Sequence, residues 1–572
     1  MRQKSFLLGC ASFAALAVPC LASAAGVAPT ASATTAAPTT VASLLALSKS
    51  AANARALAAP HAAFQVEMPR HRYPDGSTMR MAEVARLPVT ATNVTPRLAS
   101  PPASVGGFAG IYDGANAIAI GGDLEPPDQG LAVNNGQVVE IINNSLQIFK
   151  SDGTAITSPV ANATFFNVAS GLNLSDPHAE YDPVTKRWFI EELVYGSTFN
   201  GFVVAVSKTA NPAGAYWIYK IDAQGTKIPG CGAASCLPDY PQVGYDTNGF
   251  YIAADLFSNS TGNFVNAGIY ALPKALLETG GTLTYYVFVE GDFVVQPAIP
   301  APRQASSTAA GGTEYLMAAR NIYDGSTNVR VLAITNTSSL ATSSATLSLQ
   351  SVDVPAEAYT ATVPSTQPNV VGPYGNSVGA TAAPKLDGGY NAFGGGVKYA
   401  GGKLYAALTS GAADSTGLAR NIIAWFKVTP TITGTTLSAR IAAQGYVTPP
   451  DGFSVSFPSF ALNKTGVGIL GLSITGKSKT AVGGYPSTGF VDFLAAGPTG
   501  SLIVSGTGTA SDDGFTGYNG ATAGTGRWGD YATGTVDAKT GYFYTGNEFI
   551  PDTTTHPRGT YANWGTFITQ VH

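Results

Sequence analysis

The sequence predicts an all-β protein, and three observations support this prediction. Charged residues make up only 12% of the 572 residues, too few to cover the solvent faces of many helices. The chain contains 66 Gly and 36 Pro, residues that turns use for their backbone geometry. Short runs rich in Val, Ile, Tyr and Phe are bounded by tight-turn dipeptides: Asn135-Gly136, Asp152-Gly153, Asn200-Gly201, Asn248-Gly249 and Asp324-Gly325.

Composition also narrows the class of partner. Hydrophobic residues make up 45% of the chain, including 26 Tyr and 26 Phe, so the chain can bury a large core and is not globally disordered. The formal net charge is -4, which argues against nucleic acid or an anionic membrane as the partner.

Residues 1–24 are predicted to be a signal peptide. Arg2 and Lys4 provide the positive start, residues 6–21 the apolar stretch, and Ala22-Ser23-Ala24 the cleavage site. We therefore expect a secreted or periplasmic protein. A lipoprotein alternative stays open because residues 7–10 resemble a lipoprotein box. No later apolar stretch is long enough to span a membrane, so no transmembrane segment is expected.

The remaining chain divides into three parts. Residues 25–62 are rich in Ala, Thr, Ser and Pro and predict a flexible tether. Residues 63–101 are irregular and punctuated by Pro, and residues 102–572 form the β domain. In that domain Cys231 and Cys236 are predicted to form a disulfide, because the compartment is oxidising. No further cysteine or histidine lies near them at zinc-ligand spacing, so no metal site is expected there.

One hairpin pattern recurs along the β domain. A polar strand start, a turn and a second apolar strand repeat around five turn residues: Asn134, Asp182, Asp246, Asn463 and Asp537. The interval from Asp246 to Asn463 is about three times the usual spacing, which predicts two more copies, at 314–317 and 403–408. Seven copies in an all-β chain predict a seven-bladed β-propeller. Too few residues follow Asp537 for a whole blade, so a strand within 106–120 is expected to close the ring and remove its free edges.

Several short motifs within residues 105–572 resemble landmarks of a family of largely uncharacterised secreted bacterial β-propeller proteins. The resemblance implies a secreted propeller, and it implies no particular reaction. The motifs are Glu125-Pro126-Pro127-Asp128-Gln129-Gly130, Asp176-Pro177, Asn211-Pro212-Ala213-Gly214-Ala215-Tyr216-Trp217, Pro238-Asp239-Tyr240-Pro241, Arg527-Trp528-Gly529-Asp530-Tyr531 and Asn563-Trp564-Gly565-Thr566.

Candidate functional residues lie where the first hairpin strands start. The start of the first strand and the end of the second share one end of a hairpin, so these residues are expected to ring one mouth of the central channel. An acid and base pair for a glycosidic bond is one interpretation, with His178, Glu180, Asp239 and Asp530 as catalytic candidates. The ligand-binding candidates are Asp128, Asp176, Tyr240, Arg527, Trp528 and Tyr531.

Two functions stay open on the sequence alone. The first is a secreted propeller that binds a glycan or an extracellular protein at the mouth of its channel, and the second is an extracellular polysaccharide hydrolase or lyase. Because the acids recur in several blades, a structural role between blades competes with both. Carboxylates can also hold calcium, but no calcium-loop consensus is present, so we expect no cofactor. We expect a monomer.

Overall fold

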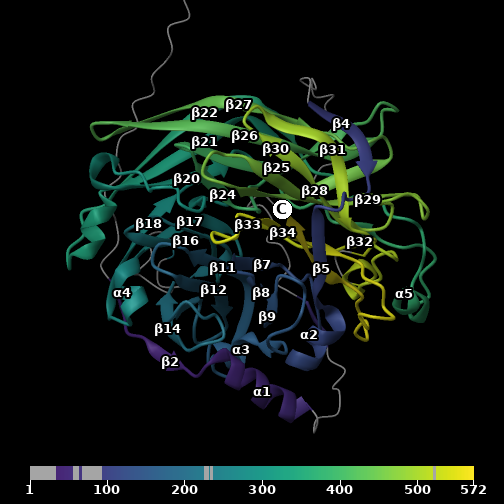
Figure 1. The fold of residues 1–572 in the computed structure, drawn as a ribbon, viewed down its shortest axis with the longest axis horizontal. Coiled ribbons are helices and arrows are strands. Elements are labelled where there is room, and N and C mark those ends of the chain that lie inside the picture. The colour runs from purple at the N-terminus through teal and green to yellow at the C-terminus, as the bar shows by residue number, and fades with distance from the viewer. Residues whose placement is uncertain (1–33, 56–63, 67–92, 224–230, 232–235, 520–522) are drawn as a thin grey trace, which may run out of the picture.

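The computed structural model describes residues 34–55, 64–66, 93–223, 231, 236–519 and 523–572. Seven groups of four antiparallel strands surround a central axis, with β7, β11, β24, β28 and β33 near the centre and other strands toward the rim (Figure 1). The seven-bladed propeller predicted from the repeated hairpins is therefore confirmed. No helix of the described residues is long and apolar enough to cross a membrane. The predicted signal peptide lies outside the described residues.

Each blade is named here by its four strands, from the channel outward. Blade 1 contains β7 (Gly130–Asn134), β8 (Gln137–Ile142), β9 (Ser145–Lys150) and β10 (Val160–Ala161). Blade 2 contains β11 (Asn173–Asp182), β12 (Arg187–Tyr195), β13 (Gly201–Ser207) and β14 (Tyr216–Asp222). Blade 3 contains β15 (Cys236–Tyr245), β16 (Gly249–Ser258), β17 (Phe264–Pro273) and β18 (Leu283–Glu290).

The remaining four blades follow the same order. Blade 4 contains β19 (Gln296–Pro300), β20 (Thr313–Ala319), β21 (Gly325–Thr335) and β22 (Ser348–Thr360). Blade 5 contains β24 (Val397–Ala400), β25 (Lys403–Ala413), β26 (Ala419–Thr433) and β27 (Thr436–Val447). Blade 6 contains β28 (Phe453–Leu462), β29 (Gly468–Gly476), β30 (Ser487–Leu494) and β31 (Gly497–Gly506). Blade 7 contains β33 (Thr533–Val536), β34 (Phe543–Phe549), β35 (Gly565–Val571) and β5 (Val105–Tyr112).

The ring closes as predicted, because β5 from the start of the domain pairs antiparallel with β35 near the end of the chain. Glu140 on β8 ties this closing strand to blade 1. Its carboxylate accepts hydrogen bonds from the backbone N–H of Ile111 on β5, at 2.8 Å, and from the Thr566 hydroxyl on β35. The closure therefore depends on side-chain contacts between the first and last blades as well as on strand pairing.

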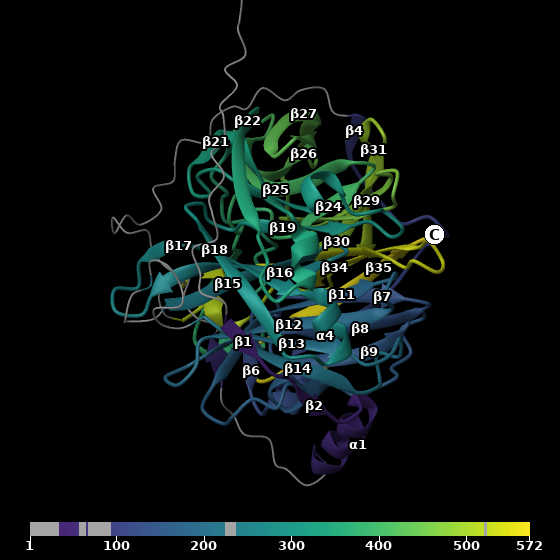
Figure 2. The ribbon, with the colours of Figure 1, turned by 90° about the vertical axis from the view of Figure 1, so that its left-hand side faces the viewer.

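The predicted tether is wrong for its described part. Within 34–55, β1 (Thr34–Ala36) pairs with β18 and β2 (Thr39–Val41) pairs with β14, so each adds a fifth strand to a blade. The helix α1 (Leu44–Arg55) follows on the rim (Figures 1 and 2). Val41 and Leu44 are buried against blades 1 and 2. The physical reason is that the outer strands of blades 2 and 3 are edges that these short strands cover.

The segment 63–101 is also less irregular than predicted. Its described parts are β3 (Phe64–Val66), which pairs in parallel with β6 (Asp123–Glu125), and β4 (Asn93–Ala99), which pairs in parallel with β31 of blade 6. Sequence propensity did not reveal these strands, because each is stabilised by pairing with a strand that lies far away in the chain.

Short helices and 3-10 turns connect strands both between blades and within blades 3 and 4. The helices are α2 (Asp113–Ile120), α3 (Asn162–Phe165), α4 (Lys274–Thr279) and α5 (Pro373–Ser377), with 3-10 turns at Ala309–Gly311, Thr337–Ala341 and Phe515–Gly517. The strands β23 (Lys385–Leu386) and β32 (Thr525–Gly526) pair in parallel.

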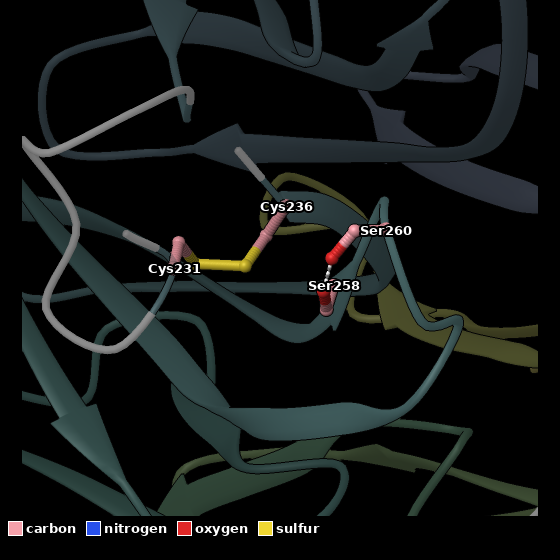
Figure 3. Close-up of a disulfide and its surroundings, with 4 residues drawn as sticks. All are labelled: Cys231, Cys236, Ser258 and Ser260. Carbon is pink, nitrogen blue, oxygen red and sulfur yellow. Dashed lines mark hydrogen bonds between the residues drawn. A yellow bond between two sulfur atoms is a disulfide. The ribbon is translucent and has the colours of Figure 1, made fainter. Parts of the chain in front are cut away.

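The predicted disulfide is present between Cys231 and Cys236 (Figure 3). Cys236 is the first residue of β15, and both cysteines are buried in the apolar layer between blades 2 and 3. The bridge therefore fixes the chain where it enters the inner strand of blade 3.

Candidate functional site

Five blades have a residue in left-handed backbone geometry either within the inner strand or two residues before it. These residues are Asp128 (φ 40°), Asp176 (φ 59°), Tyr240 (φ 55°), Val294 (φ 50°) and Phe457 (φ 51°). In blades 2, 3 and 6 this residue sits at a β-bulge, a feature that redirects side chains at a strand end. We call this end of the channel the start mouth, and the opposite end, at the hairpin turns, the turn mouth. A proline follows Asp176, Tyr240 and Phe457, and two of these pairs belong to the landmark motifs found in the sequence.

The carboxylates of Asp128 and Asp176 are buried at the start mouth and hydrogen-bonded there. Asp128 accepts from the backbone N–H of Asp530 at 2.5 Å and from the Asn143 amide at 2.9 Å. Asp176 accepts from the Tyr531 hydroxyl at 2.6 Å, and its backbone N–H donates to Asn143. These bonds connect blades 7, 1 and 2. The two aspartates were predicted to bind ligand, but here they hold blades together.

Arg527 and Trp528 are both buried and make their contacts within the protein. Arg527 forms an ion pair with Asp530 at 2.7 Å, and both side chains are buried. Trp528 is only 2% exposed and lies in the apolar cluster between blades 7 and 1. The prediction that Trp528 binds ligand is therefore wrong, because the indole fills the space between two sheets.

Three rings close the centre of the start mouth. Tyr531 is buried, and its ring stacks on Tyr240 with centroids 4.7 Å apart. His178 also contacts Tyr531, edge-to-face, with centroids 4.9 Å apart. The Tyr240 hydroxyl donates to the backbone carbonyl of Asp530 at 2.8 Å. Tyr240 and His178 are half-buried, so this plug presents part of its surface to a ligand.

His178 makes a contact between blades that recurs in blade 7. Its Nε2 is 2.8 Å from the carbonyl oxygen of Pro241 in the next blade. At the same place in blade 7, Thr533 donates to the carbonyl of Gln129 in blade 1. Burial lowers the pKa of His178 to about 4, so the ring is neutral near pH 7 and donates in this bond. This geometry favours a positioning role for His178 over proton transfer.

Asp239 is the predicted catalytic residue with the strongest acid-base features. It is half-buried beside Tyr240 and lies opposite Asp255 in the hairpin register. Burial, and secondarily the charge of Asp176, raises the pKa of Asp239 to about 8. Asp255 is buried and accepts from the backbone N–H of Val294 at 2.9 Å. Asp239 therefore keeps its proton at neutral pH and can act as a hydrogen-bond donor or an acid.

Glu180 is separated from the other predicted catalytic residues. It lines a cavity at the turn mouth together with Lys398 of blade 5. Burial raises the pKa of Glu180 to about 7, and the charge of Lys398 opposes this rise. Asp239 instead responds to the charges of Asp176, Asp530 and Arg527. The structure thus brings His178, Asp239 and Asp530 together at one mouth and places Glu180 toward the other.

A row of aromatic side chains leads outward from the plug across blades 3, 4 and 5. Consecutive ring centroids are separated by 6.3, 5.5, 5.9 and 3.8 Å. The first three contacts are edge-to-face and the last is stacked. All five rings are half-buried. In order from the plug, the aromatic row consists of Tyr240, Tyr390, Tyr323, Phe293 and Phe264.

Ion pairs hold the loops that carry this row. Asp292, next to Phe293, is ion-paired with Arg320 and with Arg330, the latter at 2.9 Å. Arg330 also pairs with Glu290 and Asp353 at 2.8 Å. The ion pairs therefore hold the chain beside Phe293 and near Tyr323 in place before any ligand arrives. The sequence showed these aromatics, but gave no indication that loops of three blades align them.

Within the described part of the chain, no three His, Cys, Asp or Glu side chains are grouped so that they could hold a metal ion. The buried carboxylates of the start mouth instead carry raised pKa values or bond to protein donors, as Asp128 does.

Comparisons with known proteins gave similarities to solved structures only. No model of a protein family and no curated protein matches the chain. An exo-β-1,3-galactanase from Clostridium thermocellum is similar at 10% identity and a TM-score of 0.28, covering 82% of this chain and 96% of that one. The endosialidase of phage phi92 is similar at 9% identity and a TM-score of 0.28, covering 78% and 66%. A sialidase from Trypanosoma rangeli is similar at 10% identity and a TM-score of 0.28, covering 75% and 57%. These values are too low to transfer a substrate or a reaction to this chain.

Proposed function

We propose that this propeller is a secreted protein that binds a neutral polysaccharide along the aromatic row at its start mouth. The observation that carries the proposal is the row itself, five half-buried rings in consecutive contact from the plug to Phe264 on β17 of blade 3. Sugar rings present apolar C–H faces that pack on aromatic rings, while their hydroxyls remain hydrogen-bonded to water. A row of rings offers successive contacts to successive sugars of one chain.

The polar groups near the aromatic row already bond to other parts of the protein, which supports binding over catalysis. His178 bonds to the next blade, Asp128 bonds between blades, and Asp530 is paired with Arg527. Groups already used in this way are not free to exchange protons with a substrate. The predicted signal peptide, which lies outside the described residues, is consistent with an extracellular polysaccharide as ligand.

Affinity electrophoresis of the mature chain in gels containing single neutral polysaccharides tests this proposal. We expect at least one of starch, xylan, β-glucan, galactan or arabinan to retard the protein. Tyr323→Ala and Tyr390→Ala should each weaken retardation by about tenfold, the loss typical of a buried aromatic contact. The matched control is Tyr542→Ala, because Tyr542 is also half-buried and stacks on another ring, His572, but lies outside the row. Equal retardation of all variants would contradict the proposal.

A polysaccharide hydrolase remains the second candidate, and Asp239 is the observation that favours it. A half-buried acid with a pKa of about 8 beside an aromatic row has the features of a general acid. The same polysaccharides should then acquire new reducing ends when incubated with the protein, and Asp239→Asn should abolish their release. Retardation without new reducing ends would exclude this second candidate for those polysaccharides.

A further inference from the structure

Two buried carboxyl groups meet where the propeller ring closes. Asp113 directly follows the closing strand β5 and is 0% exposed. Asp123 is the first residue of β6 and is 3% exposed. Both carboxyl groups accept hydrogen bonds from the loop 550–564, which leads into β35, the strand that pairs with β5. The pair therefore joins the two sides of the ring closure, in addition to the pairing of the strands.

The backbone of this loop holds the two carboxyl groups against each other. The N–H of Gly559 donates to Oδ2 of Asp113 at 2.7 Å. The N–H of Tyr561 donates to Oδ1 of Asp123 at 2.9 Å. A methyl group at Gly559 would overlap both of these oxygens, so the two carboxyl groups lie against the same backbone atom. They are also within hydrogen-bonding contact of each other.

A pair of this kind is stable when it shares a proton. Two buried carboxylates in contact repel each other, whereas one proton between them replaces the repulsion with a hydrogen bond. Oδ1 of Asp113 is buried and receives no hydrogen bond from a donor of the described residues, which leaves it able to carry the proton. Burial, and secondarily the charge of Asp123, raises the pKa of Asp113 well above its usual range. Asp113 therefore keeps a proton that an exposed aspartate has already lost.

The cations of the same loop do not remove the need for this proton. Arg558 is ion-paired with Asp513 at 2.7 Å, and its charge opposes the rise in the pKa of Asp113 only in part. His556 packs on Tyr112, and burial lowers the pKa of His556 below its ordinary value of 6.5, so the ring is neutral in alkaline solution. The other titratable groups on the surrounding elements are Glu125, Glu140, Asp512, Asp513, Glu548, Tyr112 and Tyr561.

We propose that Asp113 and Asp123 form a pH-sensitive latch on the ring closure, which is closed while the pair shares a proton and loosens when both groups are ionised. The direction follows from proton linkage. A carboxyl group whose pKa is raised by folding stabilises the closed form below its usual pKa, and this stability is lost as the pH rises toward the folded value. The latch therefore weakens in alkaline surroundings. It uses neither the aromatic row nor Asp239, so it does not depend on the function proposed above.

Hydrogen–deuterium exchange of the mature chain at about pH 6.5 and about pH 9, corrected for intrinsic exchange rates, tests the latch. We expect protection of residues 551–563 to fall by about tenfold or more, because each pH unit between the open and closed pKa values changes the opening equilibrium about tenfold. Asp113→Asn keeps an acceptor for Gly559 and gives Asp123 a permanent donor, so this variant should stay protected at both pH values. Asp552→Asn is the matched control and should behave as the wild type, because Asp552 lies in the same loop but is exposed.

Equal protection of the wild-type loop at both pH values would overturn the proposal, and so would a loss of protection in Asp113→Asn as large as in the wild type. If Asp113→Asn does not fold, Asp123→Asn gives the same test, because one amide is sufficient to remove the repulsion. The strand β13 of blade 2 is the internal reference, since it lies away from the closure. An equal fall in its protection would show a general effect of pH and would also overturn the latch.

Discussion

At the residue scale, side chains at equivalent places in different blades make equivalent bonds. His178 bonds to the carbonyl of Pro241 in the next blade, and Thr533 bonds to the carbonyl of Gln129 in the same manner. One position therefore accepts an imidazole or a hydroxyl, provided that it donates a hydrogen bond. His178 stands out in the sequence because histidine is rare in this chain, with five in all. Its geometry identifies it as one variant of a repeated contact between blades.

This interpretation predicts the protonation state of His178. Burial lowers its pKa to about 4, and a histidine whose folded pKa is lowered stays neutral at every pH above that value. The ring resonances of His178 in NMR spectra should therefore stay at their neutral positions from about pH 5 to pH 8. His178→Gln identifies the signals. A titration midpoint near the ordinary value of 6.5 would show that the ring is not buried as described.

At the element scale, the turns of the inner hairpins contain buried aspartates that accept hydrogen bonds from two blades. Asp246 accepts from the backbone N–H groups of Asn248 and Gly249 within its own turn, and from the Thr337 hydroxyl of blade 4. Asp537 accepts from Lys539 in its own turn and from Asn135 and Gly136 in blade 1. These residues fix the turn geometry and the spacing of neighbouring blades together.

Asp246→Ala should therefore destabilise the protein by about 3 kcal/mol, because it leaves several buried donors without an acceptor. Asp152→Ala is the matched control. Asp152 also accepts within a hairpin turn, from Thr154, but it is exposed and makes no hydrogen bond to another blade among the residues that the structure describes. Its loss should cost about 1 kcal/mol or less. The midpoints of urea unfolding compare the two, and equal shifts would show that the contact between blades adds nothing.

At the scale of the whole molecule, the propeller is held closed by strands from opposite ends of the domain. β5 completes blade 7, and Glu140 of blade 1 bonds to both β5 and β35. An open ring would expose β35 as an unpaired edge. In the closed ring, every blade packs against a neighbour on both sides, so no blade has a free face.

Removal of residues 1–112 should therefore open the ring, whereas removal of residues 1–92 should leave it closed. The longer deletion is expected to bind the dye ANS and to lose its cooperative thermal transition, because apolar faces of blades 7 and 1 become accessible. The shorter deletion retains β4 and β5 and should melt cooperatively. Cooperative melting of the longer deletion, without ANS binding, would contradict closure by β5.

Much of this architecture follows from the sequence because its determinants are local. Turn dipeptides and alternating apolar residues define hairpins over a few positions, and their recurrence predicts seven blades, the two copies hidden in the long interval and the closing strand. The short spacing between Cys231 and Cys236 also predicts the disulfide. Each of these features depends on residues close together in the chain or on simple counting.

The tertiary structure decided what the functional candidates do. Trp528 is buried because another sheet covers it, Asp128 and Asp176 are bonded because blades 7, 1 and 2 meet there, and residues 34–44 dock because sheet edges are free. The meeting of Glu180 with Lys398 depends on two blades that are separated by more than 200 residues of chain. Sequence determines a hairpin through local bonds, but the partner of a side chain at the channel depends on how all seven blades pack around it.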